Sequence, residues 1–224
     1  MSAPRPLSAA CDPLRGSGLA WGGSARRPAG SPRRAVLRIT LATSLAGASA
    51  AVLAAPENFV IDPAHTHVHW EVKHFGTSTS RGRFDAVSGS LTLDRAARSG
   101  NASISIATGS ISTGFAPFDG VLRGRYLLAT TEYPTAYFVA ERFEFQGDAL
   151  ASVTGVLTLR DVSQSLTLRA LRFACRVDTE PVAREVCGGD FETVFARSAF
   201  GITHSLPFVS DRVRVLIQIE ATRP

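Results

Sequence analysis

The sequence predicts an all-β domain that closes into an antiparallel barrel of eight strands. Apolar and polar residues alternate over many short runs, a pattern typical of strands with one dry and one wet face. Clusters of turn residues separate these runs, and few prolines interrupt them. Closure removes the unpaired edges of a sheet, so eight long strands favour a barrel, with a flat sandwich as the alternative.

The alternation begins near residue 66 and recurs almost to the end of the chain. Val68, Trp70 and Val72 alternate with polar residues in the first run. We expect strands at 66–75, 82–94, 102–108, 134–146, 150–160, 163–174, 190–198 and 211–222. A barrel of eight strands is either filled by its own side chains or holds one small ligand.

One segment departs from the alternation and predicts a short helix between the third and fourth expected strands. Phe118, Leu122 and Tyr126 lie at helical spacing within residues 117–130. Two glycines in the segment make a regular helix less favourable. The apolar face of this helix could cover one end of the barrel and enclose an apolar pocket.

The positive charge of the chain is concentrated before the barrel. The formal net charge is +5, but residues 1–54 contain seven arginines and one aspartate. Residues 55–224 therefore keep 17 basic and 18 acidic residues and are nearly neutral. This distribution argues against nucleic acid as a partner, because the excess charge is absent from the expected domain.

Residues 1–54 have the pattern of a leader with an export signal. Arg33 and Arg34 precede an uncharged, mostly apolar run at 39–54, and small residues follow at Ala54 and Ala55. The run is shorter than the roughly 20 residues of a membrane span, so a retained anchor is the less favoured alternative. We expect cleavage near Ala54 and a periplasmic barrel at 57–224, exported by the secretory or the twin-arginine route.

Two cysteines remain in the expected mature chain. Cys175 and Cys187 flank a polar stretch that contains Pro181. An even number of cysteines in an oxidising compartment predicts a disulfide, which we expect between these two. A metal site formed by the pair is not expected, because no further histidine or cysteine lies nearby at ligand spacing.

Four motifs in order resemble the YceI-like family. They are I-D-P-A-H-T-H-V-H-W-E-V-K-H-F-G…R-G-R-F…G-S-L-T-L-D (61–94), E-Y-P-T-A-Y-F-V-A (132–140), V-T-G-V-L-T-L-R-D-V-S-Q-S-L-T-L (153–168) and A-R-S-A-F-G-I (196–202). The resemblance covers about 59–222. It implies a periplasmic, lipocalin-like barrel whose apolar cavity binds a polyisoprenoid or similar lipid.

The chain departs from the family pattern at three positions. Asp161 stands where a turn usually has glycine, and Val121 stands where histidine often precedes Leu122. Ala199 replaces the common aspartate of the arginine motif. The last two departures concern contacts with a ligand head group rather than the fold.

A lipid pocket would be lined by residues of the inner strand phase and by the helix. Trp70, Val72 and His74 share one phase of the first strand, and the resemblance adds Phe84 and Phe138 as inward aromatics. The full set of expected ligand-binding residues is Trp70, Val72, His74, Phe84, Phe118, Leu122, Tyr126 and Phe138. We expect His74 or Tyr126 near the polar end of the ligand, with filling of the core as the alternative role for all eight.

The alternative function is a metal-binding protein or metal-dependent enzyme. His65, His67 and His69 alternate along one strand face, which is ligand spacing for a transition metal. However, Glu71 and Lys73 share their phase, which favours a solvated outer face.

The sequence carries no familiar catalytic signature. It contains no G-x-S-x-G, H-E-x-x-H or C-x-x-C motif, so we expect no catalysis, no metal and no cofactor. Arg197 could hold the turn after the seventh strand or meet an anionic head group. The expected partner is an apolar lipid, with at most transient contact with a membrane and no prediction of oligomeric state.

Overall fold

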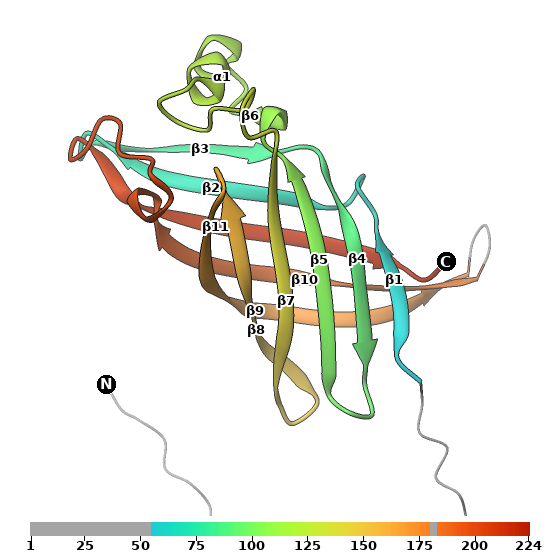
Figure 1. Cartoon of the computed structure of the whole chain (residues 1–224). Helices are drawn as coiled ribbons and strands as arrows, with labels where there is room; N and C mark the ends of the chain where they lie inside the picture. The colour runs from blue at the N-terminus through green and yellow to red at the C-terminus, as the bar shows by residue number, and fades with distance from the viewer. Residues whose placement is uncertain (1–54, 180–182) are drawn as a thin grey trace, which may run out of the picture. The chain divides into compact units, whose positions relative to one another are not determined.

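A computed structural model describes residues 55–179 and 183–224, and these form an antiparallel barrel (Figure 1). The strands of these residues are β1 (Glu57–Ile61), β2 (His67–His74), β3 (Ser78–Phe84), β4 (Val87–Asp94), β5 (Ser99–Ala107), β6 (Ile111–Ser112), β7 (Thr135–Gln146), β8 (Ala149–Leu159), β9 (Val162–Asp178), β10 (Arg184–Ala196) and β11 (Val209–Thr222). One α-helix, α1 (Ala116–Arg123), and two 3₁₀ turns, η1 (Thr108–Ser110) and η2 (Arg197–Phe200), complete the elements.

The barrel closes because β1 pairs with two strands. The order β1-β4-β5-β7-β8-β9-β10-β11 is hydrogen-bonded throughout, and β11 pairs back onto β1 at Val60↔Thr222 and Ile61↔Ala221. Farther along, β11 pairs with β2, which pairs with β3. The predicted eight-stranded antiparallel closure is therefore confirmed.

The division into strands differs from the prediction in three places. β1 precedes the first expected strand, the second expected strand is divided into β3 and β4, and the two-residue β6 follows β5. The helix therefore does not lie between the third and fourth strands, as we predicted, but after β6. A bend causes the division, since the backbone N–H of Asp85 leaves the ladder and donates to the carbonyl oxygen of Ser110 (3.3 Å).

The helix is also shorter than residues 117–130. It ends at Arg123, and the N–H of Gly124 closes it on the carbonyl oxygen of Val121 at 3.1 Å. Turns follow, so Tyr126 lies outside the helix. The periodic apolar residues continued the predicted pattern through a glycine that permits the chain to turn.

Two polar side chains fasten α1 to one end of the barrel (Figure 1). Asp119 Oδ1 accepts hydrogen bonds from the N–H (2.8 Å) and the hydroxyl (2.6 Å) of Thr113. Arg123 donates to the carbonyl oxygens of Gly109 and Ile111, both at 2.9 Å. Within the described ranges, no helix is both long and apolar enough to cross a bilayer.

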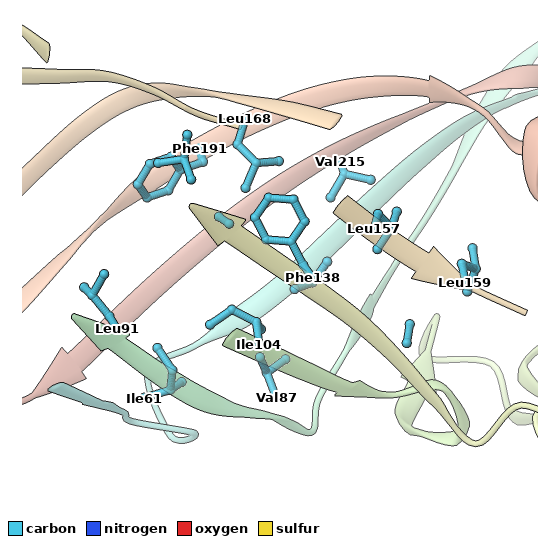
Figure 2. Packing of buried hydrophobic residues seen from close by; sticks show 14 of the residues in the cluster. Ile61, Val87, Leu91, Ile104, Phe138, Leu157, Leu159, Leu168, Phe191 and Val215 are labelled. Carbon is cyan, nitrogen blue, oxygen red and sulfur yellow. The ribbon is translucent and has the colours of Figure 1, made fainter. Parts of the chain in front are cut away.

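The inward side chains form one apolar core. Figure 2 shows Phe138, Leu157 and Leu168 pointing into the same interior from β7, β8 and β9. Phe59 and Leu93 are almost completely buried where β1 pairs with β4. Alternation places these residues on the inner face, so apolar burial and barrel closure have the same sequence origin.

The predicted disulfide between Cys175 and Cys187 is confirmed. The two residues lie directly opposite each other on β9 and β10 and are bonded through their sulfurs. The bridge therefore joins two paired strands rather than only closing a loop. Gly188 and Gly189, which follow it, interrupt the alternation and explain why β10 begins at Arg184 and not near residue 190 as predicted.

Replacing both cysteines by alanine should lower the free energy of unfolding by roughly 2–3 kcal/mol, because the unfolded chain then loses a covalent restraint over a short loop. Urea denaturation of the double variant and of the oxidised wild type measures the difference. Reduction of the wild type should give the same loss. Two free thiols titrated in unfolded, unreduced protein would contradict the bridge.

Candidate functional site

An apolar cavity of about 160 Å³ lies inside the barrel. Its aromatic wall consists of six phenylalanines, Phe84, Phe138, Phe143, Phe173, Phe191 and Phe195. Aliphatic residues complete most of the rest, and none of the described residues that line it is charged. Such a wall can accept an apolar molecule but gives a buried ion nothing to compensate its lost hydration.

The cavity is long and narrow. On β8 alone, its wall runs from Leu150 to Leu159, nearly the full strand. At about 3.3 Å per residue, this separation corresponds to roughly 30 Å along the strand. A small volume spread over that length fits an extended chain better than a wide ring system.

Small inward residues leave this space open. Ala102 and Ala136 line the cavity on β5 and β7, and Gly188 and Ala221 line it on β10 and β11. Gly188 is also required by the packing of the strands, because a β-carbon there would lie 2.6 Å from the carbonyl oxygen of Ile219. The cavity thus depends on residue size at inward positions.

Two of the eight expected ligand-binding residues, Phe84 and Phe138, are in the cavity wall. Trp70 is buried, but its ring is packed over Gly82, where a β-carbon would lie 2.6 Å from Cζ2 of the indole. Val72 is packed against the core outside the wall. Contact of these residues with a ligand stays a prediction.

The other expected residues lie at the end of the barrel near α1. Phe118 and Leu122 pack against the core from α1 without reaching the cavity. Tyr126 is 59% exposed and stacks on His204 with ring centroids 5.5 Å apart. His74 lies edge-on to Phe75 at 4.6 Å. The structure therefore does not bring these four residues together with Phe84 and Phe138.

The sequence analysis missed most of the wall on β7 to β10. Phe143, Val153, Leu168 and Phe191 line it and are inward by strand alternation. That alternation was the available signal. It did not separate residues that border empty space from residues that fill the core, since both are inward and apolar.

The three alternating histidines do not converge. The Nδ1 atom of His65 is 2.8 Å from Asp62 Oδ2, while the rings of His67 and His69 lie 6.1 Å apart and edge-on. Among residues 55–179 and 183–224, the sole cluster of potential metal ligands joins Glu185 to the two disulfide cysteines. Disulfide sulfurs are not thiolates, so this cluster lacks the ligands of a zinc site.

The environments of two histidines shift their pKa values in opposite directions. The hydrogen bond and charge of Asp62 raise the pKa of His65 above its ordinary value of 6.5. Burial, followed by the neighbouring His67, lowers the pKa of His69 below 6.5. The cause is a favoured imidazolium in one case and its loss of hydration in the other.

An NMR titration of the histidine rings should therefore show His65 losing its proton at a higher pH than His69. Replacing Asp62 by asparagine should lower the pKa of His65 because the carboxylate is removed, and it should leave His69 unchanged. The reverse order of titration in the wild type would show that His65 is not paired with Asp62 in solution.

Arg197 has a structural environment. It is 5% exposed, and its guanidinium donates to the carbonyl oxygens of Ser210 (2.9 Å), Ile202 (3.0 Å), His204 (2.8 Å) and Val209 (3.0 Å). These bonds hold the segment between η2 and β11. With its donors used in this way, the side chain fits the predicted turn-holding role and not contact with an anionic head group.

The family model of the YceI-like domain matches residues 59–221, from β1 to the end of β11. The chain belongs to the YceI-like family. The whole cavity wall lies within the matched range. The resemblance found in the four sequence motifs is thus confirmed.

Similar proteins come from several bacteria. A UPF0312 protein of Pseudomonas aeruginosa is 31% identical over 160 residues, which cover 71% of this chain and 82% of the relative. Protein YceI of Shigella flexneri is 29% identical over 194 residues, which cover 85% and 98%. The YceI-like part of this chain therefore spans most of each relative.

Two solved structures share the YceI-like fold. BcnA of Burkholderia cenocepacia superposes with a TM-score of 0.58 at 22% identity, covering 71% of this chain and 98% of BcnA. A polyisoprenoid binding domain from Saccharophagus degradans, implicated in plant cell wall breakdown, gives 0.54 at 17% identity, covering 74% and 98%. At these identities, the likeness concerns the fold.

Proposed function

We propose that this YceI-like protein binds a polyisoprenoid or a similar apolar lipid inside its barrel and does not catalyse a reaction. The observation that carries the proposal is the long cavity with its uncharged, almost entirely apolar wall. A related fold is named for polyisoprenoid binding in Saccharophagus degradans, which supports the same ligand class here.

The wall chemistry supports binding through apolar contact. Each buried CH₂ group of a chain contributes about 0.8 kcal/mol to binding, so a long isoprenoid needs few polar contacts. Among the described wall residues, no ionisable side chain is free to act as an acid, base or nucleophile, since Cys187 is bonded to Cys175. A role in binding follows more directly from this wall than a role in catalysis.

We also propose that the protein works in the periplasm after removal of residues 1–54. The disulfide and the YceI family suggest an exported protein. The expected leader, including the cleavage point near Ala54, lies outside the described residues. N-terminal sequencing of the exported protein tests this part, and a mature chain that retains the leader would overturn it.

Native mass spectrometry of the protein purified from its own host tests the binding proposal. We expect a mass above that of the mature polypeptide, which returns to the polypeptide mass after extraction with organic solvent. The extract should contain an isoprenoid or similar lipid. A bare polypeptide mass, together with no binding of an added polyprenol to the extracted protein, would overturn the proposal.

A further inference from the structure

One hydroxyl group faces the cavity without a hydrogen-bond partner. Thr193 on β10 is 8% exposed and belongs to the cavity wall. Its hydroxyl makes no hydrogen bond to any group of residues 55–179 and 183–224. Buried hydroxyls normally have partners in the protein, so an unpaired one that faces a ligand cavity points to a partner in the ligand.

Thr66, the other threonine of the wall, provides the contrast. Its hydroxyl donates to the carbonyl oxygen of Glu220 at 3.2 Å and accepts from the N–H of the same residue at 3.1 Å. Thr66 is therefore satisfied by β11 and has a role within the wall. Thr193 has the same side chain in the same cavity but remains free.

A second unpaired polar atom lies at the same level of the barrel. Thr193 pairs with Val215 on β11, and Val215 pairs with Trp70 on β2. The Nε1 atom of Trp70 is buried and has no partner among the described residues. Neighbouring strands lie about 4.8 Å apart, so the two residues are separated by roughly 10 Å across one strand.

The two groups define the chemistry that they can recognise. An indole N–H only donates, and a threonine hydroxyl can donate or accept, so both can bind an acceptor oxygen. No cation lines the described wall, which disfavours a phosphate or carboxylate because its charge would be buried without compensation. An uncharged hydroxyl or carbonyl oxygen fits both conditions.

We infer that Thr193 forms a polar subsite for an uncharged oxygen of the bound lipid, with Trp70 as a second donor beside it. This inference rests on the proposed lipid-binding function and names a chemical feature of the ligand. Thr193 lies three residues before the end of β10, next to η2. The oxygen therefore binds toward the α1 and η2 end, and the apolar tail extends toward the disulfide.

The test compares geranylgeraniol with the matching hydrocarbon that lacks its hydroxyl, using lipid-extracted protein and displacement of a fluorescent apolar probe. Wild type should bind the alcohol more tightly. Thr193→Val should weaken alcohol binding about five- to tenfold, the effect of one hydrogen bond, and leave hydrocarbon binding unchanged. Thr193→Ser, which keeps the hydroxyl, should restore the preference.

Thr66→Val is the matched control. It removes a hydroxyl from the same wall, so we expect lower thermal stability but an unchanged preference for the alcohol. The emission of Trp70, the one tryptophan in residues 55–224, gives a second readout. It should change with the alcohol more than with the hydrocarbon, because only the alcohol offers an acceptor to the indole.

The outcomes separate this inference from the proposed function. Tight binding of both ligands with equal affinity, unchanged in Thr193→Val, would overturn the subsite and leave lipid binding intact. An equal loss for both ligands in Thr193→Val would also overturn it, since the threonine would then act through packing. Binding of neither ligand to wild type would overturn both the subsite and the proposed function.

Discussion

Replacing Val153 by phenylalanine should abolish lipid binding while the barrel remains folded. Val153 lies near the middle of β8, is 5% exposed and belongs to the cavity wall. A larger ring there occupies the space that the lipid would take. Because the space is empty in the unliganded barrel, we expect little change in melting temperature, with loss of bound lipid measured by native mass spectrometry.

Val156→Phe is the matched control, since it makes the same change on the same strand but on the outer face. Val156 is 44% exposed and does not belong to the cavity wall, so this variant should retain the lipid. A barrel filled by its own side chains would respond differently. Overpacking by Val153→Phe would then cost about 1–3 kcal/mol, and a large fall in melting temperature without any lipid in wild type would contradict the cavity.

The closed barrel could be predicted because alternation and closure are linked. Strands with one dry face must bury that face, and a closed sheet does so without leaving edges. Elements that lack a repeated pattern could not be found in this way. β6 has only two residues, and β1 is short with Asn58 between Glu57 and Phe59. Such segments are fixed by pairing with distant strands rather than by local periodicity.

The candidate site was harder to predict than the fold for a physical reason. Alternation identifies inward residues, and Phe84, Phe138 and Trp70 are all buried or half-buried. Whether an inward residue borders empty space depends on the size of its neighbours across several strands. Gly82 leaves room for the indole of Trp70, so that ring is packed into the wall instead of facing the cavity.

Helical spacing had a similar limit. It predicted the partial burial of Phe118 and Leu122 but could not show where the helix would end. The chain turns after Arg123, which leaves Tyr126 exposed beside His204. A periodic pattern describes one face of a helix only while the backbone stays helical.

Replacing Arg197 by methionine should give the largest loss of stability, about 3 kcal/mol or more. Methionine keeps much of the apolar stem but donates no hydrogen bond, so four carbonyl oxygens between η2 and β11 lose their donor at once. Buried acceptors left without partners carry their full desolvation penalty. Urea denaturation at constant pH measures the effect.

Arg197→Lys should have an intermediate effect, because an ammonium keeps the charge but cannot reach as many carbonyl oxygens as the planar guanidinium. Arg98→Met is the control, since Arg98 is exposed and pairs with the exposed Asp148, and its loss should change stability little. A role in binding an anionic head group would give the opposite result. Arg197→Met would then weaken binding of a polyprenyl phosphate while leaving the free energy of unfolding close to that of wild type.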